Sequence, residues 1–261
     1  MRITIVGRGR VGRGLGAALR ATDHEVALRA GRVEARTRSS DSDVVLLAVP
    51  DDAIADVARR IERRRRQCIL HCSGSLRADV LPAGTRGVMH PLASFADPRR
   101  PPSLRGTTFV IAGDDLAVRR AKQIAKAVGA RALVRDAHGP AYHAAAALGA
   151  NGAAALAAIA VRVMATLGMT RLEAQRAIGA LLRTVGENVE NVGVPEALSG
   201  PVIRGDDGTV HRHRVALEGL DPEAREAYDA VAPAILDCAA RAGLPEGRAD
   251  AIRAALRRKP R

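Results

Sequence analysis

The sequence predicts an α/β protein in which a doubly wound parallel sheet is followed by a region built from helices alone. Short apolar runs alternate with amphipathic stretches as far as about residue 135. The apolar runs, such as DVVLLAV, are continuous, which is typical of parallel strands buried on both faces. Beyond His138 the strand pattern stops and long helical stretches follow.

The first part of the chain contains seven expected strands. Their ranges are 3–6, 24–29, 42–50, 67–72, 85–91, 107–113 and 131–136. Helices are expected between them at 11–21, 51–66, 76–81 and 114–129. The polar connection 30–41 is short, so we expect an abbreviated link there instead of a full crossover helix.

The second part contains four expected helices, within 139–168, 170–193, 222–243 and 246–258. Residues 194–213 are rich in turn-forming residues. The predicted domains are therefore 1–136 and 137–261. Residues 144–164 are apolar enough to resemble a membrane span, but Asn151 and Arg162 interrupt them. We expect a buried domain helix and no membrane.

The formal charge is +13, which raises the possibility of a nucleic-acid partner. Nearly all the basic residues are arginines, however, and no aromatic residues lie among them to stack on bases. The composition therefore favours a small-molecule partner, although a nucleic-acid binder stays open as an alternative. No N-terminal apolar stretch resembles a signal peptide, so a cytoplasmic location is expected.

Three cysteines are too few and too scattered for a disulfide framework. The segment CILHC suggests a metal site formed by Cys68, His71 and Cys72. In a strand, however, successive side chains point to opposite faces, which separates His71 from the two cysteines. We therefore expect no metal.

Gly7, Gly9 and Gly12 form the pattern G-x-G-x-x-G between an expected strand and an expected helix. This is the context of a dinucleotide-binding turn, where the glycines permit a tight turn, the approach of a pyrophosphate, and helix–strand packing. The free N–H groups of the following helix would face the phosphates. A plain strand–helix turn is the alternative. If the turn binds a dinucleotide, the cofactor is also expected to contact the residues between these glycines, which are Arg8, Arg10 and Val11.

The end of the second strand indicates which dinucleotide binds. An acidic residue there would accept a hydrogen bond from the ribose of NAD, but the chain has Arg29 and Arg32, with no carboxylate before Glu34. Guanidinium groups match a 2′-phosphate, so the expected cofactor is NADP (NADPH). The alternative is that these arginines only reflect the composition of the whole chain. The nicotinamide of the cofactor would lie over Val49 and Pro50.

Polar residues follow several strands at the edge of the sheet where ligands bind in this class of fold. Ser73 and Ser94 are placed to bind a substrate, and His90 could donate a proton. In the helical part, Tyr142, His143 and Asn151 interrupt a run of alanines. They indicate a cleft, although a turn cap or a satisfied buried histidine is the alternative for each.

Six motifs in this order resemble one uncharacterised family: GRGRVGRGL, DVVLLAVPDDAI, HCSG, HPLASFADP, YHAAAALGAN and SGPVIRGD. This DUF2520-type family joins a Rossmann-like domain to a C-terminal helical domain of unknown function. It is similar to deazaflavin-dependent NADP oxidoreductases, ketopantoate reductase, pyrroline-5-carboxylate reductase and β-hydroxyacid dehydrogenases. The resemblance implies NAD(P) binding and a helical domain like the C-terminal domain of 6-phosphogluconate dehydrogenase, through which a homodimer forms. Arg204, within the last motif, would line the cleft.

The resemblance also predicts the catalytic residues, with one departure. In ketopantoate reductase and the hydroxyacid dehydrogenases, a catalytic Lys is followed by Asn one or two helical turns later. The comparable positions here are His143, Ala147 and Asn151, and the stretch contains no Lys. The proton role would then pass to His143, Tyr142 or His90, with His143 expected as the general acid.

The sequence thus favours an NADP-dependent oxidoreductase that acts on a small polar carbonyl, imine or hydroxy compound. Ser73, Ser94, Asn151 and Arg204 would hold this substrate. The alternative is a protein that binds NADP(H) without catalysis, as a sensor, and the missing Lys is its main support.

Overall fold

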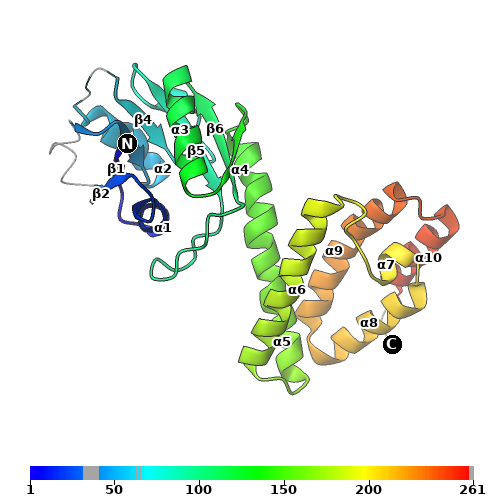
Figure 1. Cartoon of the computed structure of the whole chain (residues 1–261). Coiled ribbons are helices and arrows are strands. Elements are labelled where there is room, and N and C mark those ends of the chain that lie inside the picture. The colour runs from blue at the N-terminus through cyan, green and yellow to red at the C-terminus, as the bar shows by residue number, and fades with distance from the viewer. Residues whose placement is uncertain (32–40, 63, 65, 259–261) are drawn as a thin grey trace. The chain divides into compact units, whose positions relative to one another are not determined.

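The computed structural model describes residues 1–31, 41–62, 64 and 66–258 (Figure 1). The chain forms two compact units, Met1–Ala150 and Asn151–Arg261. All the described strands lie in the first unit, which also includes helix α4 (Pro140–Ala147). The division between the units therefore follows Ala150, whereas the sequence predicts a boundary after residue 136, at the end of the strands.

Seven strands form one sheet in the order β2-β1-β3-β4-β5-β6-β7. Their bounds are β1 Arg2–Val6, β2 Glu25–Arg29, β3 Val44–Leu47, β4 Cys68–His71, β5 Arg86–Leu92, β6 Thr108–Gly113 and β7 Arg131–Val134. Strands β1 to β5 are parallel, which confirms the doubly wound α/β fold. Strand β6 runs antiparallel to β5, with β7 parallel to β6. Residues 93–107 return the chain by a loop, whereas a parallel neighbour would need a crossover.

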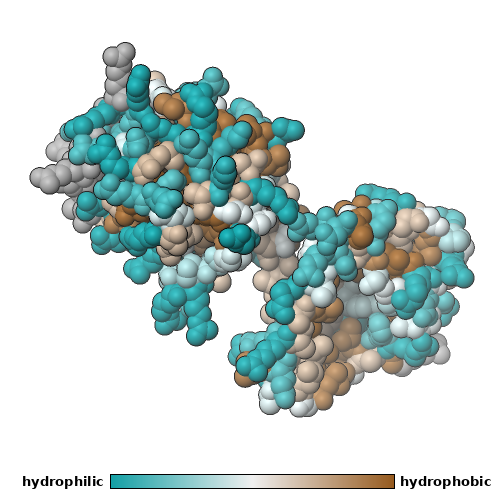
Figure 2. All heavy atoms as spheres, in the orientation of Figure 1, coloured by the Kyte–Doolittle hydropathy of each residue, from teal (hydrophilic) through white to brown (hydrophobic). Residues whose placement is uncertain are grey.

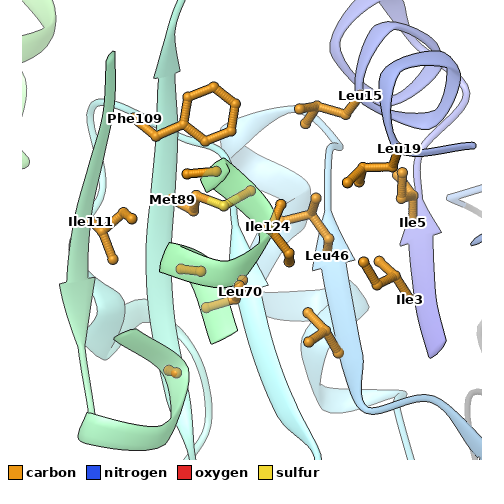
Figure 3. Packing of buried hydrophobic residues seen from close by; sticks show 14 of the residues in the cluster. Ile3, Ile5, Leu15, Leu19, Leu46, Leu70, Met89, Phe109, Ile111 and Ile124 are labelled. Atoms are coloured by element: carbon orange, nitrogen blue, oxygen red, sulfur yellow. The ribbon is translucent and has the colours of Figure 1, made fainter. Parts of the chain in front are cut away.

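The central strands are buried on both faces because their side chains alternate between two cores. Val44 and Leu46 of β3 join the first core, together with residues of α1 (Arg10–Arg20) and α3 (Asp115–Ala127) (Figure 3). Val45 and Leu47 join the second core, together with residues of α2 (Asp51–Arg59). The continuous apolar runs in the sequence follow directly from this arrangement.

Three connecting elements differ in how they compare with the sequence expectations. Helix α2 ends at Arg59, earlier than the expected residue 66. The arginines that follow crowd like charges, which disfavours another helical turn. Residues 32–40 lie outside the described part of the chain, so the expected abbreviated link after β2 stays a prediction. The short helix expected at 76–81 is the 3-10 turn η3 (Ala78–Val80).

The alternation of β4 separates the candidate zinc ligands as expected. Cys68 and Cys72 pack with the first core. His71, in register with Leu47, faces the side of the second core. Among the described residues, no group of three or more His, Cys, Asp or Glu side chains is arranged to hold a metal ion.

The second unit is helical. A π-helical segment, η4 (Leu148–Gly152), leads from α4 to α5 (Ala153–Thr166). The helices that follow are α6 Arg171–Asn191, α7 Pro201–Arg204, α8 Asp207–Leu220, α9 Pro222–Arg241 and α10 Glu246–Arg257. The turn-rich interpretation of residues 194–213 is wrong for its second half, because Asp206 accepts a hydrogen bond from the Thr209 amide and caps α8.

A buried arginine ties the last three helices together. Arg214 of α8 is 4% exposed and donates to both carboxylate oxygens of Asp229 on α9, at 2.7 and 3.0 Å. It also donates to the carbonyl oxygens of Ala255 and Arg258, at 2.7 and 2.6 Å. The apolar core beside it contains Val202, Val210, Leu236 and Ile252.

The apolar helical run Pro140–Thr166 is long and apolar enough to cross a membrane by length and composition, with a mean hydropathy of 1.8 in its most apolar window. None of that window is buried, so the expectation of a buried domain helix is wrong within a single copy of the chain. Apolar surface is visible along the second unit (Figure 2). A single helix of this kind is weak evidence for a membrane span.

Candidate functional site

The three glycines of the turn after β1 differ in what a side chain would meet. Gly7 has a φ of 122°, and a Cβ there would collide with the carbonyl oxygen of Ala48. A Cβ on Gly12 would collide with the carbonyl oxygen of Gly7, so this glycine lets α1 pack closely. A Cβ on Gly9 would meet nothing within 4 Å. Gly9 therefore faces open space, as the pyrophosphate position of a dinucleotide turn requires.

The N-terminus of α1 is prepared for an anion. Gly9 is its N-cap and offers no capping side chain, and no acidic residue lies in the first turn. The first N–H groups of a helix lack partners within the helix and carry the positive end of its dipole. A phosphate at this turn would therefore be stabilised by the backbone.

A cavity of about 480 Å³ opens beside this turn. Its lining residues are Gly7, Arg8, Gly9, Gly31, Ala48, Val49, Pro50, Asp52, Ala53, Asp56, Val57 and Arg60. They come from the ends of β1, β2 and β3 and from one face of α2. The cavity thus lies where the strand order reverses between β1 and β3, the usual ligand position in open α/β sheets.

Only some of the residues expected at the cofactor line this cavity. Gly7, Arg8, Gly9, Val49 and Pro50 line the cavity, whereas Gly12 packs behind it. The first two residues of α1 after its cap, Arg10 and Val11, are not among the lining residues. Arg29 is exposed at the end of β2, where its carbonyl oxygen accepts from the Gly7 amide at 2.9 Å. Arg32 lies outside the described residues.

Helix α2 contributes side chains to this cavity that were not predicted from the sequence. Asp52, Asp56 and Arg60 present two carboxylates and a guanidinium to the cavity. Their spacing of four residues places them on one helix face directly after β3. That pattern could have been found by examining the helix after β3 as closely as the one after β1.

A second group of polar side chains lies on the neighbouring strands. His71 ends β4 and His90 lies in β5, while Tyr142 and His143 lie in the first turn of α4. Tyr142 Oη is 2.8 Å from Nδ1 of His90, and the two rings meet edge to face. The rings of His90 and His143 are 6.0 Å apart, and that of His138 is 5.3 Å from Tyr142. The structure thus brings together the three expected catalytic residues.

The loop after β4 fits tightly between these rings. A Cβ on Gly74 would lie 3.0 Å from ring atoms of His90 and 3.2 Å from His143. The carbonyl oxygen of Gly74 accepts from the Gly139 amide at 3.1 Å, which joins the loop to the start of α4. Beside it, Ser75 Oγ lies 3.5 Å from Nδ1 of His143.

The expected substrate-binding residues are placed differently from one another. Ser73 is buried, and its Oγ accepts from the amides of Ser75 and Leu76, both at 3.1 Å, so this hydroxyl holds the turn. Ser94 is exposed in the loop after β5. Asn151 and Arg204 belong to the second unit, where both are exposed and Arg204 ends α7.

The buried histidines are neutral at physiological pH. His71 accepts from the Ser73 amide at Nδ1, so its Nε2 carries the hydrogen that faces the Arg77 carbonyl oxygen, 3.1 Å away. Burial lowers the pKa of His71 to about 4. Burial also lowers the pKa of His90 to about 4, reinforced by the neighbouring His138 and His143. His71 and His90 are therefore neutral imidazoles, which donate at one nitrogen and accept at the other.

We expect the ring signals of His71 and His90 to titrate with midpoints near pH 4 in NMR spectra of the folded protein. The ordinary midpoint is about 6.5. Because the folded pKa is the lower one, the unfolded chain binds more protons between these values, and acidification through this window destabilises the fold. A midpoint at or above 6.5 for both residues would contradict the described burial.

The fold and the cavity define a class of protein: a Rossmann-type unit with a cavity at its glycine-rich turn, followed by a helical unit. Residues 107–235 match the family model described as "Domain of unknown function (DUF2520)". This match, to just under half of the chain, confirms the expected resemblance to that family. None of the curated proteins compared with the chain matches it.

Solved structures share the fold over nearly the whole chain. A Thermotoga maritima protein is 25% identical with a TM-score of 0.67, covering 92% of this chain and 99% of its own. A Bacteroides fragilis protein described as a candidate NADP oxidoreductase is 20% identical with a TM-score of 0.70, covering 90% and 98%. A Plasmodium falciparum pyrroline carboxylate reductase with NADP bound is 11% identical with a TM-score of 0.58, covering 97% and 98%.

Proposed function

We propose that this protein is an NADP-dependent oxidoreductase that reduces or oxidises a small polar carbonyl, imine or hydroxy compound. One observation carries the proposal: the cavity beside Gly9 lies at the carboxyl ends of β1 and β3, and the His90–Tyr142 pair lies near that of β5, with only β4 between them. Leu47 of β3 pairs in register with His71 of β4, so the chain leaving β3 toward Val49 runs beside the loop that follows β4. A dinucleotide in the cavity would thereby bring its reactive ring toward polar side chains.

The preference for NADP is supported by charge. The described end of β2 carries Arg29 and no carboxylate, whereas an acidic residue there would suit the free ribose of NAD. In the cavity lining, the charges of Arg8 and Arg60 are balanced by those of Asp52 and Asp56, so the preference rests on the end of β2. Two proteins of similar fold are described with NADP in their names, which agrees with this choice.

The chemistry needs a hydride and a proton. The reduced dinucleotide supplies the hydride when bound. The residues of this chain bind and orient the substrate and move the proton, for which the His90, Tyr142 and His143 cluster is the available set in the first unit. Ser75 and Ser94 add hydroxyl groups in the loops that follow β4 and β5, while Ser73 holds the turn after β4 in shape.

The test combines binding with turnover. Fluorescence titration with NADPH should show saturable binding to the purified chain. Oxidation of NADPH should then follow on addition of at least one member of a panel of small aldehydes, α-keto acids and cyclic imines. Tight NADPH binding without turnover across the panel would favour the sensor alternative, and absence of NADPH binding would remove both functions.

We also propose a homodimer that forms through the helical unit. A groove of about 520 Å³ runs between α5 and α6. Most of the large hydrophobic side chains that the described residues leave exposed lie in this unit, among them Leu156, Leu181, Leu182 and Val185. Exposed apolar side chains on neighbouring helices are typical of a surface that a partner covers. A second copy is the simplest occupant, because two identical apolar faces can cover each other across a two-fold axis.

Substituting Leu182 with Glu should convert the dimer to a monomer, because the new charge would be buried in an apolar interface. Analytical ultracentrifugation should show twice the chain mass of 27.4 kDa for the wild type and the mass of one chain for the variant. Arg183→Glu, at the adjacent exposed position, is the matched control and should stay dimeric. A wild-type monomer at micromolar concentration would contradict the proposal.

A cytoplasmic location, where reduced NADP is available, forms part of the proposed oxidoreductase function.

A further inference from the structure

Tyr142 has an environment that sets it apart from the other candidate proton donors. It is one of two tyrosines in the chain and lies among histidines from three segments. Its hydroxyl is 2.8 Å from Nδ1 of His90. The ring of His138, itself 4% exposed, packs against its ring. Tyr142 is only partly buried, so its phenol is fixed by neighbours without being sealed from a ligand.

The proton content of the pair follows from its surroundings. Burial lowers the pKa of His90, which is therefore a neutral imidazole at pH 7 with one N–H. Burial raises the pKa of Tyr142, so the phenol keeps its hydrogen. The pair thus carries two hydrogens, the imidazole N–H of His90 and the phenol O–H of Tyr142. At most one of them lies in the hydrogen bond between Nδ1 and Oη. If Nδ1 of His90 carries the imidazole hydrogen, it donates to Oη, and the phenol hydrogen is free for a ligand.

We infer that Tyr142 is the catalytic acid and base of the proposed reaction, and that His90 positions its phenol and passes protons to it. This inference rests on the proposed function. In the reducing direction, hydride adds to the substrate carbon while the C=O or C=N π pair takes the phenol hydrogen. The Nδ1 hydrogen of His90 moves to the phenolate oxygen, and Nε2 takes a proton from water. The pair is then a phenol and a neutral imidazole protonated at Nε2, with one solvent proton consumed. Proton exchange with water, a loss at Nε2 and a gain at Nδ1, restores the starting pair before the next turnover.

This division of labour leaves His143 a different task. Its side chain is exposed, and its Nδ1 lies 3.5 Å from the Ser75 hydroxyl. As the residue next to Tyr142 on a helix, it projects about 100° around the axis, so it reaches a different part of the same site. His143 therefore orients the substrate through hydrogen bonds, and its loss should raise KM more than it lowers kcat.

The first test needs no substrate. Nitrogen-15 chemical shifts of the histidine rings report which nitrogen carries the hydrogen. The wild type should show His90 protonated at Nδ1. The Tyr142→Phe variant should lose that preference, because the acceptor oxygen is gone. A wild-type His90 that is protonated at Nε2 would overturn the inference, since its Nδ1 would then accept the phenol hydrogen and hold it away from a ligand.

The second test measures turnover of NADPH with the best substrate of the carbonyl and imine panel. Tyr142→Phe should lower kcat by about 100-fold or more, the usual loss when an acid–base group is removed, with NADPH affinity unchanged. His90→Asn, which retains a donor near the Nδ1 position but cannot pass a proton, should lower kcat and alter its pH profile. His143→Gln should act mainly on KM.

Tyr228→Phe is the matched control, because Tyr228 forms a similar edge-to-face pair with His213 in the second unit, with Oη 3.4 Å from Nδ1. Its turnover should match the wild type. Turnover by Tyr142→Phe within twofold of an active wild type would remove the role of Tyr142 and leave the proposed function standing. A wild type that binds NADPH but turns over no panel member would instead remove the proposed function, and the role of Tyr142 with it.

Discussion

Substituting Gly9 with Ala should abolish most of the NADPH affinity while leaving the fold intact. A Cβ at Gly9 meets no protein atom within 4 Å, so the folded chain accommodates it. The same Cβ points into the space where the cofactor pyrophosphate must approach the backbone. We expect the dissociation constant for NADPH to rise by about tenfold or more, equivalent to about 1.4 kcal/mol.

The matched control is Gly16→Ala on the same helix. A Cβ at Gly16 would lie 3.7 Å from Cδ1 of Ile5, an ordinary packing contact away from the cavity. This variant should keep wild-type affinity and a similar or slightly higher thermal midpoint, because Ala favours the helix over Gly. Equal NADPH affinity for Gly9→Ala and wild type would mean that the dinucleotide does not bind at this turn.

Substituting Arg214 with Met should destabilise the second unit by about 3–5 kcal/mol, as expected when one partner of a buried ion pair is removed. The guanidinium is 4% exposed and joins α8 to the Asp229 carboxylate on α9 and to two carbonyl oxygens at the end of α10. Without it, these acceptors lose a charged donor in a poorly hydrated place. Urea denaturation followed by circular dichroism measures the loss.

Arg212→Met provides the comparison for that measurement. Arg212 lies on the same helix but is exposed, and it donates to the Thr209 hydroxyl at the surface. Its substitution should change the free energy of unfolding by no more than about 0.5 kcal/mol. If both variants unfold at the same urea concentration, Arg214 does not hold these helices together.

The first unit could be predicted largely from sequence because its determinants are local. The strand before Gly7 and the glycine spacing after it define a turn within a dozen residues, and the structure places them as expected. Helix α8 was missed because Gly208 and the two histidines after it weaken its helical pattern, while the Asp206 cap that begins it resembles a turn. The antiparallel direction of β6 depends on how a loop folds, which apolar patterns do not encode.

The site was predicted residue by residue but not as contacts. Spacing suggested His90, Tyr142 and His143 separately, yet the hydrogen bond between His90 and Tyr142 joins positions 52 residues apart. Likewise, Ser73 and Ser75 cannot be told apart from the sequence around them. The geometry of the turn shows that the Ser73 hydroxyl oxygen already accepts hydrogen bonds from two amides. Such distinctions arise from tertiary packing, and a single sequence does not contain them in local form.

The central claim is that the cavity beside Gly9 binds NADP(H) in preference to NAD(H). Parallel fluorescence titrations of the purified chain with NADPH and NADH test it most directly. We expect NADPH to bind at least about tenfold more tightly, a difference of about 1.4 kcal/mol, because arginine stands where an acidic residue would favour NADH. Equal affinity for the two, or tighter binding of NADH, would contradict the account.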